Sequence, residues 1–159
     1  MHDHAFVWKQ YDLVRGITLA VLKKVPAEQA DIVPEGFANN IRWNLGHILT
    51  VQESCMYGLD FTHLPASYKT LFGPGTKPAD WQGEVPSLSA LAEQLEEQKE
   101  RIKRTFGDRL HRELAEPFVL RSGAQMSTLG EMFVFSLFHE GMHIGTINAL
   151  KKALAVTQP

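Results

Sequence analysis

The chain has 159 residues, of which 44% are hydrophobic and 21% charged. This composition is typical of an ordinary globular protein and excludes a disordered or fibrous one. We expect one domain over residues 1–159, because two domains of half that length would each have a marginal core. The formal net charge of −2 gives no positive field for nucleic acid. We therefore expect no nucleic acid as a partner. No uncharged apolar run approaches the roughly 20 residues of a membrane helix, so we expect no membrane as a partner either.

The single cysteine and the N-terminal residues bear on the cellular compartment. Cys55 has no second cysteine with which to form an internal disulfide or a cysteine-based zinc site, which is typical of a reducing compartment. The first five residues lack a basic region and lead into an amphipathic pattern, so we predict no signal peptide. A cytoplasmic location is therefore expected.

Four long segments show helical periodicity and predict an all-α protein, a four-helix bundle with a long loop between helices 2 and 3. The first helix is expected over about residues 3–24, ending before Pro26, and the second over about residues 40–59, with Asn40 as its N-cap. On the first helix the spacing predicts an inward apolar stripe and a solvated face of Lys9, Asp12 and Arg15. The predicted stripe is Phe6, Gln10, Leu13, Ile17 and Val21.

The predicted loop, residues 62–86, contains four prolines and a Gly-Pro-Gly cluster. A segment of that length in a compact domain is either disordered or functional. Its aromatic and apolar residues favour a structured cover that packs against the bundle. These residues are Tyr68, Leu71, Phe72 and Trp81.

The third helix is predicted to start at Ser87, with Leu91, Leu95 and Ile102 among its inward residues and a solvated face of i,i+4 ion pairs, Glu97–Arg101 and Glu100–Arg104. Residues 107–125 lose the periodicity, and 118–123 predict a short extended piece with a turn. The fourth helix opens with a capping box, residues 128–131, and is expected to run to about residue 155.

The fourth helix contains two histidines four residues apart, His139 and His143, which on a helix lie on one face and can bind one metal ion. The periodicity places both on the predicted inward stripe, and His47 lies on the inward stripe of the second helix. Burying three imidazoles costs several kcal/mol unless they are hydrogen-bonded or coordinated. We therefore predict a metal site built from His47, His139 and His143. The predicted stripe is Met132, Phe135, His139, Met142, His143, Thr146 and Leu150.

Two better-known metal sites do not fit these residues. A zincin peptidase needs a third ligand after its His-Glu-x-x-His motif, but residues 144–159 contain no His, Asp, Glu or Cys. A di-iron carboxylate bundle needs two Glu-x-x-His units, and only residues 140–143 match. A mononuclear site of three histidines remains.

Two segments resemble a known family. Residues 39–48 read NNIRWNLGHI and residues 139–145 read HEGMHIG, and together with the helical layout they look like the DinB/YfiT-like superfamily of small helical metalloproteins. The resemblance implies a four-helix bundle, often dimeric, with one histidine on the second helix and a His-x-x-x-His pair on the last. It assigns His47, His139 and His143 as ligands of one divalent ion, with zinc and nickel favoured, and it implies a homodimer.

The resemblance further implies a metal-dependent enzyme that activates a low-molecular-weight thiol for S-transfer to a small-molecule substrate. Two alternatives stay open: a hydrolase that activates metal-bound water, and a non-catalytic bundle stabilised by its ion. The sequence assigns no catalytic residue and no thiol-binding residue. Glu140 is interpreted either as a helper of the site or as a plain polar residue facing solvent or a neighbouring helix, and Cys55 as a buried filler. Three helical glycines indicate close packing or room beside the metal: Gly46, Gly141 and Gly145.

Overall fold

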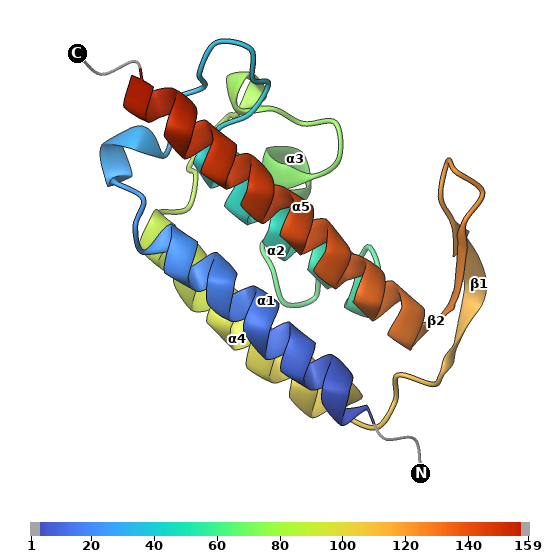
Figure 1. Ribbon diagram of the computed structural model, residues 1–159. Helices are drawn as coiled ribbons and strands as arrows, with labels where there is room; N and C mark the ends of the chain where they lie inside the picture. Colours follow the sequence, from blue (N-terminus) through green and yellow to red (C-terminus); the bar gives the residue numbers. More distant parts are fainter. Residues whose placement is uncertain (1–3, 157–159) are drawn as a thin grey trace.

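The computed structural model describes residues 4–156. Its framework is a bundle of four long helices, which confirms the predicted all-α fold (Figure 1). Residue 3, where the first helix was expected to begin, lies outside the described residues. No helix in residues 4–156 combines the length and the apolar character needed to span a membrane. The four helices are α1 (Ala5–Leu22), α2 (Ile41–Tyr57), α4 (Leu88–Phe106) and α5 (Leu129–Val156).

The packing of the helices puts α2 and α5 side by side. Helix α1 packs against α4 and α5, and α2 packs against the same two helices, so α1 and α2 lie diagonally across the bundle. Any chemistry built between α2 and α5 therefore draws on segments about 90 residues apart in the sequence.

Local side-chain caps set the starts of three helices at the predicted residues. The Asn40 side chain accepts from the Trp43 amide at 2.8 Å, and the Ser87 hydroxyl accepts from the Ala90 amide at 3.1 Å. At α5 the Thr128 hydroxyl accepts from the Glu131 amide at 3.2 Å, while the Glu131 carboxylate accepts from the Thr128 amide at 2.9 Å. This reciprocal pair is the predicted capping box.

The long loop between α2 and α4 is a structured cover, as predicted. It contains the short helix α3 (Tyr68–Phe72) and the 3₁₀ turn η2 (Pro78–Asp80); a second 3₁₀ turn, η1 (Ala27–Gln29), follows α1. The Trp81 indole donates to the Leu71 carbonyl at 2.8 Å, which fixes the loop upon α3. Buried loop side chains join the main apolar core, among them Tyr68, Leu71 and Phe72.

Between α4 and α5 the chain forms a hairpin of two antiparallel strands, β1 (Glu113–Val119) and β2 (Gln125–Thr128). Gly123 takes φ +85 in the turn, a conformation that glycine adopts without strain. The predicted extended piece and turn are confirmed, and the first strand begins earlier than the pattern indicated. The hairpin lies beside the start of α5 (Figure 1).

The predicted inward face of α1 is wrong. Phe6, Leu13 and Ile17 are 68%, 56% and 43% exposed. The buried face is rotated by about one residue and includes Arg15, which was expected to be solvated. The buried residues of α1 are Val7, Tyr11, Arg15, Thr18 and Leu22.

A buried polar layer explains this rotation. Each long helix contributes one side chain to it. The Arg15 guanidinium donates to the Glu140 carboxylate at 2.9 and 3.1 Å and also to Gln52 and Gln98. A buried charge needs such partners, so the bundle turns Arg15 inward at the expense of apolar neighbours on α1. The four members are Arg15 of α1, Gln52 of α2, Gln98 of α4 and Glu140 of α5.

The predicted solvated face of α4 also needs correction. Arg101 does bind Glu97 at 3.0 Å, but its guanidinium turns inward and pairs with buried Glu53 at 3.2 Å. Glu100 pairs with Lys99 at 3.4 Å. Arg101 is buried because the carboxylate of Glu53, on α2, accepts from its guanidinium.

Candidate metal centre

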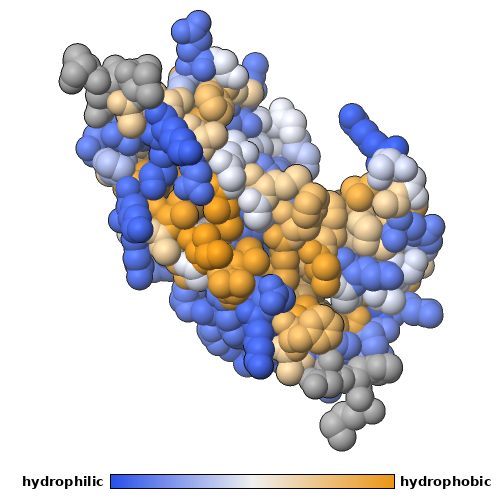
Figure 2. All heavy atoms as spheres, in the orientation of Figure 1, coloured by the Kyte–Doolittle hydropathy of each residue, from blue (hydrophilic) through white to orange (hydrophobic). Residues whose placement is uncertain are grey.

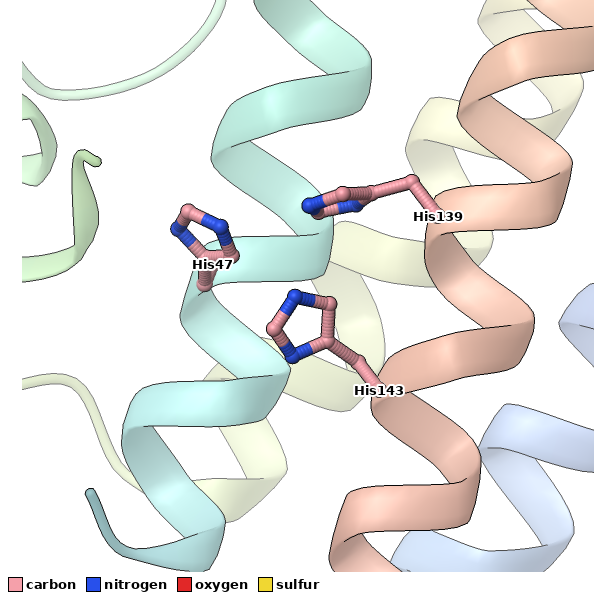
Figure 3. Close-up of side chains that lie close together, drawn as sticks. All are labelled: His47, His139 and His143. Carbon is pink, nitrogen blue, oxygen red and sulfur yellow. The ribbon is translucent and has the colours of Figure 1, made fainter. Parts of the chain in front are cut away.

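The three predicted histidines meet between α2 and α5. His47 projects from α2, and His139 and His143 project from successive turns of α5 toward it (Figure 3). One ring nitrogen atom of each histidine can be chosen so that the three lie within 4.8 Å of one another. The His47 ring centroid is 5.0 Å from that of His139 and 4.8 Å from that of His143. The cluster could hold one metal ion.

The face of α5 that carries the histidines differs from the predicted one. Met142 and Thr146, expected to face inward, are exposed, and the buried residues include Phe133, Glu140 and Ile147. His139 and His143 are half-buried at the edge of this buried stripe. The pair therefore borders the bundle interior without being sealed in it, which suits a site that exchanges small molecules.

Hydrogen bonds orient two of the rings. His47 Nδ1 lies 2.6 Å from the Phe72 carbonyl, and His143 Nδ1 lies 2.7 Å from Asn44 Oδ1. Since Asn44 Nδ2 donates to the Asn40 carbonyl at 2.8 Å, its Oδ1 faces His143 as an acceptor. Both Nδ1 atoms must donate, which leaves each Nε2 with a free lone pair. Metal-binding histidines almost always have such a second partner.

The rings are electrically neutral at physiological pH. Burial lowers the pKa of His139 to about 3, helped by the neighbouring rings of His143 and His47. Burial and the His47 ring lower the pKa of His143 to about 4, and burial lowers that of His47. Neutral imidazole is the form that binds a metal, so the site is ready for one without first losing protons.

These shifts predict how the stability of the metal-free protein depends on pH. The pKa of a histidine in the unfolded chain is about 6.5. Because the pKa values of these histidines are lower in the folded state, they bind protons when the chain unfolds at a pH below about 6.5, and this favours unfolding. The stability linked to these histidines is therefore fully present above about pH 6.5 and is lost as the pH falls through about 4 to about 3. Urea unfolding in EDTA across this range measures the loss. A metal-free H139Q/H143Q double variant should give a flatter profile, and an equally steep one would contradict the prediction.

Gly46 lets the covering loop reach the site. A Cβ built on Gly46 would overlap the ring of Phe72, the residue whose carbonyl holds His47. By contrast, Gly141 and Gly145 are exposed, with open space where a Cβ would be. Of the two expectations, close packing is therefore confirmed at Gly46, whereas open space lies beside Gly141 and Gly145.

We predict that Gly46→Ala destabilises the protein by about 1–3 kcal/mol, because the Phe72 ring and α3 must shift. The same shift moves the Phe72 carbonyl away from the His47 ring and should therefore weaken metal binding. Gly141→Ala is the matched control on a helix interior with open space, and it should be neutral or stabilising by up to about 1 kcal/mol. Urea midpoints and metal titrations of both variants check this; equal effects would refute it.

Glu140 and Cys55 have surroundings that define their roles. Glu140 is buried, pairs with Arg15 and accepts from the Thr18 hydroxyl at 2.6 Å, so of the two expected surroundings it faces a neighbouring helix and not solvent. It anchors α5 to α1 beside His139. Cys55 is half-buried, and burial raises its pKa to about 12, so its thiol is protonated at neutral pH.

Sequence reasoning missed the groups that orient the rings. Asn44 lies one helical turn before His47 on α2, and a polar residue on a buried helical face was the available signal. The Phe72 carbonyl carries no side-chain signal and depends on how the loop folds back. Trp43 stacks on the His47 ring with centroids 4.4 Å apart, so it supports a proposed ligand.

Comparison with known protein families matches residues 10–147 to the DinB superfamily, a range that includes all three histidines. The chain belongs to the DinB superfamily. No curated protein matches the sequence. Superfamily membership and the three-histidine cluster together fit metal binding.

Proposed function

We propose that this member of the DinB superfamily is a metal-dependent enzyme. His47, His139 and His143 hold one divalent ion, zinc or nickel, which activates a low-molecular-weight thiol for S-transfer to an electrophilic small molecule. The observation that carries the proposal is the donor set. Three neutral imidazoles converge, and within residues 4–156 no carboxylate or cysteine joins their cluster. Structural zinc normally has four protein ligands, so a three-ligand set favours a site with a position for substrate.

The chemistry divides between the ion and the chain. A bound divalent ion supplies a Lewis acid that lowers the pKa of a thiol, so that the nucleophilic thiolate exists at neutral pH. The thiol sulfur forms a bond to the electrophilic carbon, the bond from that carbon to its leaving group breaks, and the thiol proton goes to solvent. Asn44 and the Phe72 carbonyl keep two imidazoles in the ligating orientation. Cys55 does not supply the thiolate, because its pKa is about 12.

The test is a thiol-conjugation assay on untagged protein loaded with zinc or nickel. Glutathione, mycothiol and bacillithiol are each mixed with 1-chloro-2,4-dinitrobenzene, and thioether formation is followed by absorbance. We expect a metal-dependent rate with at least one thiol and its loss in His139→Gln. Background rates with every thiol would overturn the proposal. In that case, ester hydrolysis in the absence of thiol would identify the protein as a hydrolase. A bound ion with neither activity would identify the ion as structural.

We also propose that the protein forms a homodimer, as the family resemblance implies. An apolar face along α1 and α5 supports it, where orange side chains gather in Figure 2. Two hollows of about 340 and 460 Å³ on this face are both lined by Val134 and Phe138. Sedimentation velocity should show a dimer that Phe138→Asp converts to monomer; a monomeric parent would refute this. The exposed residues are Phe6, Leu13, Ile17, Val134, Phe138 and Met142.

A further inference from the structure

A cavity of about 560 Å³ is lined by residues one helical turn from two of the three histidines, His47 and His139. On α2 it is lined by Thr50 and Val51, three and four residues after His47 and hence one turn along the same face. On α5 it is lined by Phe135, one turn before His139, and the two ring centroids are 6.4 Å apart. From the loop it is lined by Gly73, which follows the residue whose carbonyl holds His47.

The lining of this cavity is apolar with one cationic residue. Phe61, Phe118 and Phe135 contribute aromatic rings, and no carboxylate from residues 4–156 lines it. Among the described residues that line it, Lys69 alone is charged. The Lys69 ammonium is exposed, lies 4.9 Å from the centroid of the Phe61 ring, and takes part in no ion pair within the described residues.

A second observation points to a ligand. Thr50 lines the cavity, and its hydroxyl oxygen is buried without a hydrogen-bond partner. A buried hydroxyl in this condition is destabilising, and an acceptor atom brought in by a ligand would satisfy it. The cavity thus combines an apolar interior, an unpaired cation and an unsatisfied donor, which is the usual composition of a small-molecule site.

We propose that this cavity binds the apolar body of an organic anion, an aryl or alkyl carboxylate, with the carboxylate at Lys69. The aromatic lining favours an aryl group through ring contacts, and the absence of lining carboxylates leaves the field of Lys69 uncompensated. The larger cavity of about 920 Å³ suits no such ligand, because its lining includes Asp31, Arg42 and Glu84, charges of both signs. That the bound anion is the electrophile of S-transfer rests on the proposed function; that the cavity binds it does not.

Calorimetric titration with 4-phenylbutyrate and with uncharged 4-phenylbutan-1-ol tests the proposal. Lys69→Met should weaken binding of the carboxylate about five- to tenfold and change binding of the alcohol less than about twofold, as expected for one partly solvated charge pair. Lys77→Met, which removes an exposed lysine of the same loop, is the matched control and should change neither. Failure of the carboxylate to bind, or equal binding by Lys69→Met, would overturn the proposal.

Labelling of Cys55 locates the ligand in the unmodified chain. Cys55 is the only cysteine and lines this cavity, so its rate of reaction with N-ethylmaleimide reports on occupancy. Saturating 4-phenylbutyrate should slow labelling at least about fivefold at pH 8.5; binding without protection would place the ligand elsewhere and overturn the proposal.

Both measurements are made on metal-loaded protein and on the metal-free His139→Gln variant. Binding and protection without thiol transfer leave the cavity proposal standing and count against the proposed function. Thiol transfer without binding of the carboxylate would support the proposed function and overturn the cavity proposal.

Discussion

Replacing Arg15 by methionine is expected to lower the free energy of unfolding by about 3–5 kcal/mol. Arg15 and Glu140 are 0% and 1% exposed, and their carboxylate–guanidinium contact joins α1 to α5. Without Arg15 the Glu140 carboxylate remains buried with only the Thr18 hydroxyl as a described partner. Breaking a buried pair from one side costs far more than the net contribution of the pair, because one charge loses its compensation.

Urea unfolding with linear extrapolation measures this loss. Lys103→Met is the control, since Lys103 of α4 pairs near the surface with Asp12 of α1, the helix that also carries Arg15. It should cost no more than about 1 kcal/mol. The double variant Arg15→Met, Glu140→Met should recover part of the loss because both charges are gone. A single variant no less stable than Lys103→Met would show that the polar layer does not govern stability.

Removing any of the three histidines is expected to abolish stoichiometric metal binding. Untagged parent protein should hold about one divalent ion per chain, and His47→Ala and His143→Ala should each lose it, because the site needs ligands from both α2 and α5. Elemental mass spectrometry of the purified proteins measures the content. Equal metal in all three proteins, or none in a folded parent, would mean that the histidines are core residues and would remove the basis of the proposed enzyme.

Two further variants sharpen that measurement. Asn44→Leu removes the acceptor that holds His143 and should weaken metal binding about 10- to 100-fold while leaving the three ligands in place. His111→Ala replaces an exposed histidine on the segment after α4 and should leave the content unchanged. An unchanged affinity in Asn44→Leu would show that the ring orientation needs no such support.

The helix starts and the histidine spacing were predictable because each depends on residues within one helical turn. Asn40, Ser87 and the Thr128–Glu131 pair cap amides three residues away, so the sequence alone located those helix starts. The four-residue spacing of His139 and His143 places them on one face of any helix. The inward position of His47 followed from the same periodicity.

The sequence by itself thus determined the all-α bundle, the starts of three of its long helices and the spacing of the histidines, since these follow from local backbone hydrogen bonding and helical period. The tertiary structure alone decided which face of α1 is buried and what orients the imidazoles. Arg15 is buried because acceptors 37 to 125 residues away surround it, and Phe72 reaches His47 across 25 residues. No local periodicity encodes such partners, because the free energy of burying a charge or fixing a ring depends on groups that only the folded chain brings together.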